Sequence, residues 1–262
     1  MFIYTMTRPF VGEFDTIQLN TFRAWQALGL DMAVFCERSY DALYMRDTLG
    51  FDGITGVRTN SSAIPLVNAI IALGETLGLR NYHDTFVCAN ADNIFLPDFL
   101  TAIPIVAAKS TERRFNGFCA VGRRTNLDVA HKLDFTAPAI FDELADAAKK
   151  AQSEGHLASY HAVDWFAYLP AGLFGDVPDF AIGRGQYDCW LLNRAVEAGA
   201  LVVDVTDAVT VIHQNHSPAT ATSGRWGEES AMSNRELAGD AVMGINETPF
   251  VMTAEGEIVE RG

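Results

Sequence analysis

The sequence predicts an α/β fold in which a mostly parallel sheet is flanked by helices. Short runs of apolar, β-forming residues alternate with segments whose apolar residues follow a helical period, and this alternation continues through the first hundred or so residues. The spacing leaves room for one helix between successive strands, which is the pattern of right-handed βαβ units. A length of 262 residues suits one such domain with a substantial core.

The elements of the amino-terminal part follow from local signals. The first strand stops at Arg8, because Pro9 cannot continue it. Asp15 is expected to cap the next helix and Gly29 to end it, and Gly78 is expected to end a later helix. Together these signals predict strands at residues 2–7, 32–36, 53–57 and 85–89, and helices at residues 15–28, 40–49 and 65–77.

The pattern changes after Pro97, which is expected to begin a helix. Neither a linker nor an internal repeat is visible beyond it. One apolar run contains a lone acid, Asp164, and the last stretch resembles a short hairpin. This part is expected to hold strands at residues 115–123, 163–169 and 201–213 (one strand or a strand pair), helices at 139–152, 187–198 and 228–237, and the hairpin at 250–259.

Composition and charge exclude some functions. The formal charge of −14 disfavours a nucleic-acid surface, because phosphate contacts need clustered Lys and Arg, and Arg113-Arg114 with Arg123-Arg124 is the one candidate for a local basic pocket. No stretch is long and apolar enough to span a membrane, and the opening residues lack the regions of a signal peptide, so a cytoplasmic protein is predicted. The four cysteines are far apart, which predicts buried free thiols.

The turn after the strand at 85–89 is the strongest candidate for a ligand site. Asn90 and Asp92 stop this strand, and a parallel strand delivers such residues to the crevice at its carboxyl end. With one residue between them on an extended backbone, both side chains are expected to point the same way, which suits two oxygen ligands of one hard cation. The alternative is ordinary turn chemistry, in which Asn and Asp are common.

Two imidazoles, His213 and His216, follow another apolar strand. A histidine at a strand end is exposed to whatever occupies the crevice there, and a neutral imidazole would complete a metal site that Asp92 begins. The alternative is that both histidines cap the strand through backbone hydrogen bonds.

Two further carboxylates and two aromatic residues are candidates for substrate chemistry. Asp188 is expected in the first helical turn after the Gly183-Arg184-Gly185 loop, where it is either a general base or an ordinary helix-start acid. Asp164 is costly to bury unpaired, so it is expected to bind a partner or to line a pocket. Trp165 and Tyr168 could present a stacking face to a sugar ring, with core packing as the alternative.

Several short motifs, spread over almost the whole chain, occur in a fairly specific order and spacing. They lie at residues 8–10 with 17–18, 90–92 with 96–100, 121–124 with 127–128, 180–184, 188–192, 203–206, 211–216 and 234–239. This series resembles a group of bacterial and plant glycosyltransferase-like proteins with the GT-A fold, similar to glycosyltransferase family 2. The resemblance implies one domain over residues 1–262, with a nucleotide-sugar-binding half at 1–100, an acceptor and catalytic half at 101–216, and a tail at 217–262.

The resemblance also implies a donor and a cofactor. The donor would be a nucleoside diphosphate sugar, with a UDP-sugar favoured, and Mn²⁺ or Mg²⁺ would bridge its phosphates. Residues 90–92 correspond to the Asp-x-Asp motif of the family, so Asp92 would ligate the cation and His213 would be a further ligand. Asn90 replaces the first Asp of that motif, which weakens the expected metal site because a neutral amide binds a cation less strongly than a carboxylate.

The remaining roles follow from the same resemblance. Thr7 and Arg8 would lie near the nucleotide base, Asp188 matches the catalytic carboxylate of inverting enzymes, and Arg184 or Arg123 would add a cationic contact. The substrate-binding residues expected from the sequence are Thr7, Arg8, Asn90, Arg123, Asp164, Trp165 and Arg184. The predicted function is a metal-dependent, inverting glycosyltransferase whose acceptor is open.

Two other functions fit the same fold. A sugar-nucleotide nucleotidyltransferase normally needs a glycine-rich loop with several basic residues after the first strand, whereas residues 7–12 contain only Arg8. A non-catalytic sugar-nucleotide or glycan-binding module is supported by the substitution at Asn90.

Overall fold

The structure is a computed structural model, and it describes residues 1–216 and 229–262. The strands are β1 (Phe2–Met6), β2 (Asp31–Phe35), β3 (Phe86–Ala89), β4 (Asn93–Phe95), β5 (Phe118–Val121), β6 (Thr125–Leu127), β7 (Trp165–Leu169), β8 (Leu201–Asp204), β9 (Val211–Gln214), β10 (Phe250–Met252) and β11 (Ile258–Glu260). The helices are α1 (Glu13–Ala27), α2 (Ser39–Leu49), α3 (Val67–Arg80), α4 (Asp98–Glu112), α5 (Ile140–Ser153), α6 (Tyr187–Glu197) and α7 (Glu229–Ala238), with a 3₁₀ turn at Ile245–Glu247.

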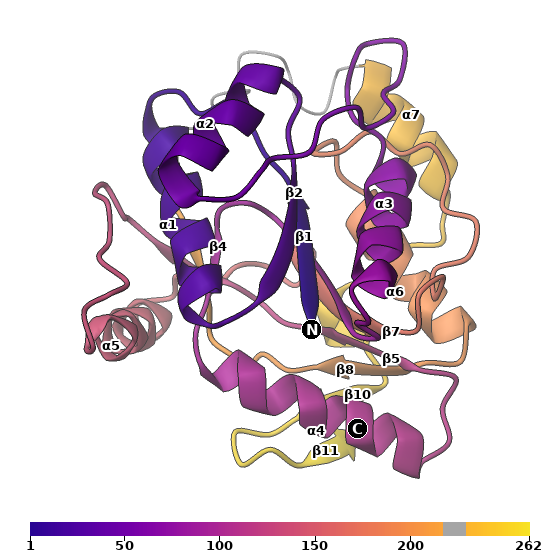
Figure 1. Ribbon diagram of the computed structural model, residues 1–262. Helices are drawn as coiled ribbons and strands as arrows, with labels where there is room; N and C mark the ends of the chain where they lie inside the picture. The colour runs from indigo at the N-terminus through magenta and orange to yellow at the C-terminus, as the bar shows by residue number, and fades with distance from the viewer. Residues whose placement is uncertain (217–228) are drawn as a thin grey trace.

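The strands form two sheets (Figure 1). The larger sheet has eight strands in the order β11-β10-β8-β5-β7-β3-β1-β2, and the smaller one has the order β4-β9-β6. In the larger sheet β1 pairs in parallel with β2 and β3, and β5 pairs in parallel with β8. The predicted fold class, a mostly parallel α/β sheet flanked by helices, is therefore confirmed.

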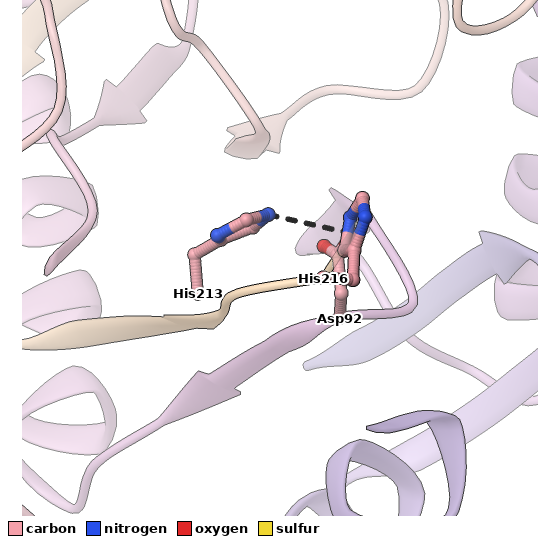
Figure 2. A group of neighbouring side chains, drawn as sticks. All are labelled: Asp92, His213 and His216. Carbon is pink, nitrogen blue, oxygen red and sulfur yellow. Dashed lines mark ion pairs between the residues drawn. The ribbon is translucent and has the colours of Figure 1, made fainter. Parts of the chain in front are cut away.

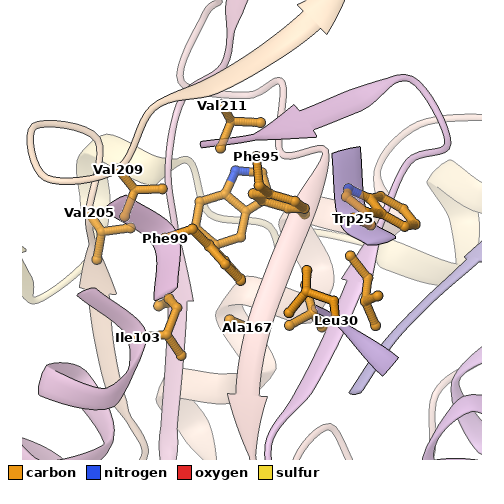
Figure 3. Close-up of a cluster of buried hydrophobic side chains, with 14 of the residues drawn as sticks. Trp25, Leu30, Phe95, Phe99, Ile103, Ala167, Val205, Val209 and Val211 are labelled. Carbon is orange, nitrogen blue, oxygen red and sulfur yellow. The ribbon is translucent and has the colours of Figure 1, made fainter. Parts of the chain in front are cut away.

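Helices cover both faces of the larger sheet, because buried strand residues alternate between two cores. Along β1, for example, Ile3 belongs to the core under α1, α2 and α4, whereas Phe2 and Tyr4 belong to the core under α3, α6 and α7. The first of these cores is rich in aromatic rings (Figure 3). Trp165 of β7 lies 5.5 Å from Phe95 and 5.7 Å from Phe99, measured between ring centroids.

The smaller sheet packs against α5, which lies on the same side of the molecule as β4 in Figure 1. Its core joins Ile94 of β4 and Ile212 of β9 to Leu144 of α5. β4 and β9 are antiparallel, with Asn93 opposite His213. This pairing brings the turn after β3 next to the end of β9, and it thereby positions the candidate site.

Several sequence expectations need correction. The strand expected at 53–57 is reduced to one bridge, between Phe35 and Ile54. Asp15 is inside the first turn of α1, whose N-cap is Gly12. Gly78 does not end α3, which continues to Arg80, and Asp164 precedes β7 and is not part of it.

The expected strand or strand pair at 201–213 is a pair, and its members belong to different sheets. β7 is antiparallel to both of its neighbours, β3 and β5, and the edge strand β11 is antiparallel to β10, whereas the other pairs of the larger sheet are parallel. The helix and the hairpin expected near the carboxyl end are confirmed as α7 and the β10–β11 pair. Residues 217–228 of the expected tail lie outside the described residues. Over the described residues, we find no helix long and apolar enough to cross a membrane.

Candidate metal centre and cavity

A cavity of about 510 Å³ lies at the carboxyl ends of β1 and β3. This is the edge of a parallel sheet at which ligands bind in open α/β folds. Three segments that are far apart in the sequence line it, namely residues 6–9 after β1, residues 90–92 after β3, and residues 182–188 before and within α6. The cavity volume is within the range of small-molecule sites.

Asp92, His213 and His216 form a cluster beside this cavity (Figure 2). One potential ligand atom from each residue lies within 4.8 Å of the others. Oδ2 of Asp92 is 3.6 Å from Nε2 of His213 and 3.4 Å from Nε2 of His216. All three side chains are largely buried, with exposed fractions of 12–14%.

Gln214 holds the turn that carries Asp92 against β9. Its backbone N–H donates to the carbonyl of Asp92 over 3.1 Å. Its buried side chain donates to Ile17 O and Thr21 Oγ1 on α1, and it accepts a hydrogen bond from Asn20 Nδ2, each over 3.0 Å. The cluster is thus fixed by contacts between the turn, β9 and α1.

The electrostatics of the cluster suit a cation. Burial acts to raise the pKa of the Asp92 carboxyl, but the hydrogen bond with His216 and the charges of His213, His216 and Arg124 together hold that pKa below its ordinary value. Burial is also the main reason that the pKa of His213 falls to about 4, so this imidazole is neutral at pH 7. The cluster at neutral pH therefore offers an ionised carboxylate and a neutral imidazole, which are the protonation states that bind metal ions.

One buried atom of the cluster supports the same interpretation. Among the described residues, Oδ1 of Asp92 has no hydrogen-bond partner although it is buried. A buried carboxylate oxygen normally has a partner, and a cation beside Asp92 would supply one. One carboxylate with two imidazoles is a mixed oxygen and nitrogen donor set, which favours Mn²⁺ over the oxygen-preferring Mg²⁺.

Asp164 lies beside the cluster and is paired with Arg124. The exposed fractions of the two side chains are 14% and 18%, so the ion pair is largely buried. Asp164 also lines the cavity, and its carbonyl accepts the backbone N–H of Asn90 over 2.9 Å. Asp164 therefore both binds a partner and lines a pocket, the two environments that the sequence left open.

Arg8 lines the cavity from the β1 side. Gln18 of α1 fixes its main chain, because Arg8 N donates to Oε1 of Gln18 over 2.7 Å and Nε2 of Gln18 donates to Arg8 O over 3.1 Å. The guanidinium lies 4.8 Å from the centre of the Phe14 ring, and His216 also lies near that ring, at 5.0 Å between centroids. Thr7 is buried and donates its hydroxyl to Phe35 O over 3.2 Å.

Arg184 and Asp188 also line the cavity. Arg184 is part of a loop with left-handed backbone at Gly183 (φ 68°), Gly185 (φ 78°) and Gln186 (φ 68°), and Asp188 follows this loop. Asp188 lies in the first turn of α6, as predicted, and its Oδ1 accepts the N–H of the next residue over 3.0 Å. The loop thus presents a cation and a carboxylate to one cavity.

Two residues expected to bind substrate have other surroundings. Trp165 is 1% exposed and Tyr168 is fully buried, and they belong to the cores on opposite faces of the sheet. The expected sugar-stacking face is therefore wrong, because successive odd and even strand positions point away from each other into packed cores. Arg123 does not line the cavity, since its Nε donates to Ala158 O over 2.6 Å and its guanidinium lies 4.2 Å above the Tyr160 ring.

The sequence alone missed two contributors to the site, Phe14 and Glu37, and it named a third, His216, without a ligand role of its own. His216 joins Asp92 as closely as His213 does, although only its place near the strand end suggested it. Phe14 and Glu37 line the cavity, and burial is the main cause of the raised pKa of the Glu37 carboxyl. The position of Glu37, two residues after the end of β2, was the available signal, because Arg8 likewise lies two residues after the end of β1.

Comparisons with known proteins give distant similarities only. No family model and no curated protein sequence matches the chain. Glucosyl-3-phosphoglycerate synthase from Mycobacterium tuberculosis, solved with Mn²⁺, UDP-glucose and phosphoglyceric acid, is 13% identical, with a TM-score of 0.46 over 91% of this chain and 79% of that chain. TarS from S. aureus, solved with UDP-GlcNAc, is 8% identical, with a TM-score of 0.46 over 92% of this chain and 70% of that chain.

The matched structures also include a nucleotidyltransferase. The inositol-1-phosphate CTP transferase from T. maritima is 14% identical, with a TM-score of 0.39 over 92% of this chain and 97% of that chain. Similarity at this level is too distant to assign an activity.

Proposed function

We propose that the protein is a glycosyltransferase that uses a nucleoside diphosphate sugar and a divalent cation. The observation that carries the proposal is the Asp92–His213–His216 cluster, which stands at the wall of a cavity that also receives Arg8 and Arg184. A carboxylate and imidazoles can hold a metal ion, and guanidiniums can bind the phosphates of a diphosphate attached to that ion.

The charge balance of the cavity supports the need for a cation. Among the described residues, four carboxylates and two guanidiniums line it: Glu37, Asp92, Asp164 and Asp188 against Arg8 and Arg184. Asp164 is already paired with Arg124, but the remaining carboxylates would still repel a bare diphosphate. A divalent cation on Asp92, His213 and His216 would supply the missing positive charge and stabilise the charge that develops on the leaving diphosphate. Because imidazole donors are present, we propose Mn²⁺ as the better of the two expected ions.

The residues of this chain have separate roles in the proposed reaction. Arg8 and Arg184 bind the diphosphate, and Asn90 and Thr7 shape the cavity beside it. Asp188 takes the proton of the acceptor hydroxyl. At the same time the oxygen of that hydroxyl bonds to the anomeric carbon of the sugar, and the bond from that carbon to the nucleoside diphosphate breaks. Attack from the side opposite the leaving group would invert the anomeric centre. In this proposal residues 1–100 supply most of the donor site, and residues 101–216 supply Asp188 and the acceptor side.

Thermal unfolding with a ligand panel tests donor binding. The panel holds UDP-, GDP-, CDP- and dTDP-sugars, each with and without Mn²⁺. A ligand at a hundred times its dissociation constant adds about 2.7 kcal/mol to the free energy of unfolding. We expect one nucleotide, with UDP favoured, to raise the melting temperature only when Mn²⁺ is present. No response to any nucleotide under either condition would refute the proposal.

Asp188→Asn tests the catalytic role. We expect turnover to fall by at least about a hundredfold while donor affinity stays within a few-fold, because a general base acts in the transition state and contributes little to binding. Asp176→Asn is the matched control, since Asp176 is exposed and outside the cavity. Equal turnover in both variants would remove Asp188 from its role.

The non-catalytic binding module remains the second candidate, and Asn90 is the observation that favours it. It predicts tight nucleotide-sugar binding with neither transfer nor hydrolysis under any metal. The nucleotidyltransferase alternative predicts release of pyrophosphate from a nucleoside triphosphate and a sugar phosphate. Assays of released nucleoside diphosphate and of released pyrophosphate on the same sample separate the three functions: a glycosyltransferase releases the first, a nucleotidyltransferase the second, and a binding module neither.

A further inference from the structure

Asn234, on α7, holds the loop that leads into α6. Its Oδ1 accepts the N–H of Ala181 over 2.8 Å, and its Nδ2 donates to Ala181 O over 2.9 Å and to Gly185 O over 3.0 Å. The residue is 1% exposed. One buried side chain therefore satisfies three main-chain groups of a segment that belongs to neither a helix nor a regular strand pair.

The loop needs such a partner because its backbone is not self-supporting. Gly183, Gly185 and Gln186 all have left-handed φ values, between 68° and 78°. For Gln186 this conformation is disfavoured by its own Cβ, and it persists only where the surroundings fix it. Two of the three left-handed residues directly flank Arg184, so the direction of that side chain depends on the loop conformation.

The segment after β1 that lines the cavity has the same arrangement. Gln18, which is 2% exposed, binds both the N–H and the carbonyl of Arg8, as Asn234 binds both groups of Ala181. A buried amide side chain on a helix thus fixes the main chain of Arg8 itself and the main chain next to Arg184. We call the three hydrogen bonds of Asn234 the amide clamp.

We propose that Asn234 is a positioning residue whose amide clamp sets the conformation of residues 181–186, and through it the places of Arg184 and Asp188 in the cavity. The roles of Arg184 and Asp188 in this statement rest on the proposed function. The clamp itself is a property of the fold, so it can be measured without any activity.

The first test is limited trypsin digestion of Asn234→Asp. The carboxylate still accepts the Ala181 N–H, but it loses both donor hydrogen bonds and faces two carbonyl oxygens. Cleavage after Arg184, measured by mass spectrometry relative to cleavage after the exposed Lys132, is expected to rise about tenfold, because proteolysis reports the population of the opened loop. Asn81→Asp is the control: Asn81 is exposed, and its amide also donates to a carbonyl, that of Leu77.

A second variant keeps the test valid if a buried carboxylate prevents folding. Asn234→Ala removes the amide clamp without adding charge, and it is expected to raise the Arg184 cleavage ratio in the same direction. A ratio within twofold of wild type in every Asn234 variant that folds would overturn the proposal.

The third measurement links the clamp to the cavity. Calorimetric titration with inorganic pyrophosphate and Mn²⁺ does not depend on the base or the sugar, and we expect Asn234→Asp to weaken this binding about tenfold. A raised cleavage ratio with unchanged pyrophosphate affinity would reduce Asn234 to a structural role and overturn the proposal. If the wild-type protein itself fails to bind pyrophosphate with Mn²⁺, the proposed function falls, and the digestion still decides whether the amide clamp holds the loop.

Discussion

At the scale of single residues, Asp92 carries the greatest share of the candidate site. It is the one carboxylate of the cluster, and both imidazoles lie within 3.6 Å of its Oδ2. The charges around it keep its pKa below the ordinary value, so it is ionised over the whole physiological range. An ionised, buried carboxylate with one unpartnered oxygen among the described residues is poorly satisfied without a cation.

We therefore expect Asp92→Asn to weaken Mn²⁺ binding by about a hundredfold or more, since the change removes the negative charge and leaves two imidazoles. Isothermal titration with Mn²⁺ alone measures this. Asp142→Asn removes the same charge from an exposed position of α5 and serves as the control. Unchanged Mn²⁺ affinity in Asp92→Asn would show that the ion binds elsewhere.

Glu75 provides a pH-dependent prediction away from the cavity. Burial is the main cause of its raised pKa, and it outweighs the hydrogen bonds that the carboxylate accepts from Gly172 N and Tyr168 Oη. The folded-state pKa lies above the unfolded-state value. The ionised form is therefore penalised in the folded protein, and stability is lost as the pH rises through the folded-state pKa.

Glu75→Gln removes this titration, and its amide oxygen can still accept the same hydrogen bonds. We expect the variant to be more stable than wild type at pH 7, with the gain shrinking at pH 4, where the wild-type carboxyl is largely protonated. Urea unfolding at the two pH values gives both differences. A gain of equal size at pH 4 and pH 7 would mean that the charge of Glu75 is not its cause.

At the scale of elements, α3 shows where local sequence signals reach their limit. Gly78 was expected to end the helix, yet the helix continues past it. An added Cβ at Gly78 would come within 2.7 Å of the Phe86 ring, and one at Gly74 within 2.4 Å of the Tyr4 ring. Both glycines are there to let α3 approach the aromatic rings of the sheet. A sequence cannot distinguish this from a helix end without knowing what lies opposite.

Gly74→Ala tests this explanation. In an exposed helix position the change would stabilise the protein by about 1 kcal/mol, because alanine is the better helix former. Here we expect a loss of about 1–3 kcal/mol, the usual cost of overpacking a tight contact. Urea unfolding measures the sign, and Thr76→Ala at an exposed position of the same helix is the control. A stabilised Gly74→Ala variant would contradict the close packing of α3 on Tyr4.

Other elements also differ in whether local sequence or contacts with distant residues determine them. Long periodic segments such as α1, α4 and α5 could be predicted, because their apolar faces and breakers are written in the sequence. β4 could not, since its three residues continue directly from the turn at Asp92 and form a strand only because β9 lies beside them. The antiparallel direction of β7 is likewise set by its neighbours and not by its own residues.

At the scale of the whole molecule, the candidate site depends on contacts between distant parts of the chain. The sequence identified Asp92 and His213 as candidates, and it placed both at strand ends. It could not show that β9 leaves the larger sheet and pairs with β4, which is what brings them together. The pairing of Asp164 with Arg124 and the contact between the rings of Phe14 and His216 are equally non-local.

The fully buried side chain of Gln214 makes several of these long-range contacts. Its amide joins α1, through Ile17, Asn20 and Thr21, to the turn of Asp92. Gln214→Met keeps the approximate shape and removes all of these hydrogen bonds, leaving the polar partners on α1 buried. We expect a loss of about 2–4 kcal/mol in the free energy of unfolding, because each unsatisfied buried group costs about 1–3 kcal/mol.

The same variant should also bind Mn²⁺ about tenfold more weakly, since the turn that carries Asp92 loses a side-chain support, and saturating Mn²⁺ should restore part of the lost stability. Urea unfolding with and without Mn²⁺, together with calorimetric titration, measures both effects. Gln152→Met is the control, because Gln152 donates to Thr125 Oγ1 and is not a member of the cluster. If Gln214→Met lost stability but bound Mn²⁺ normally, the metal centre would be held by β4 and β9 alone, without α1.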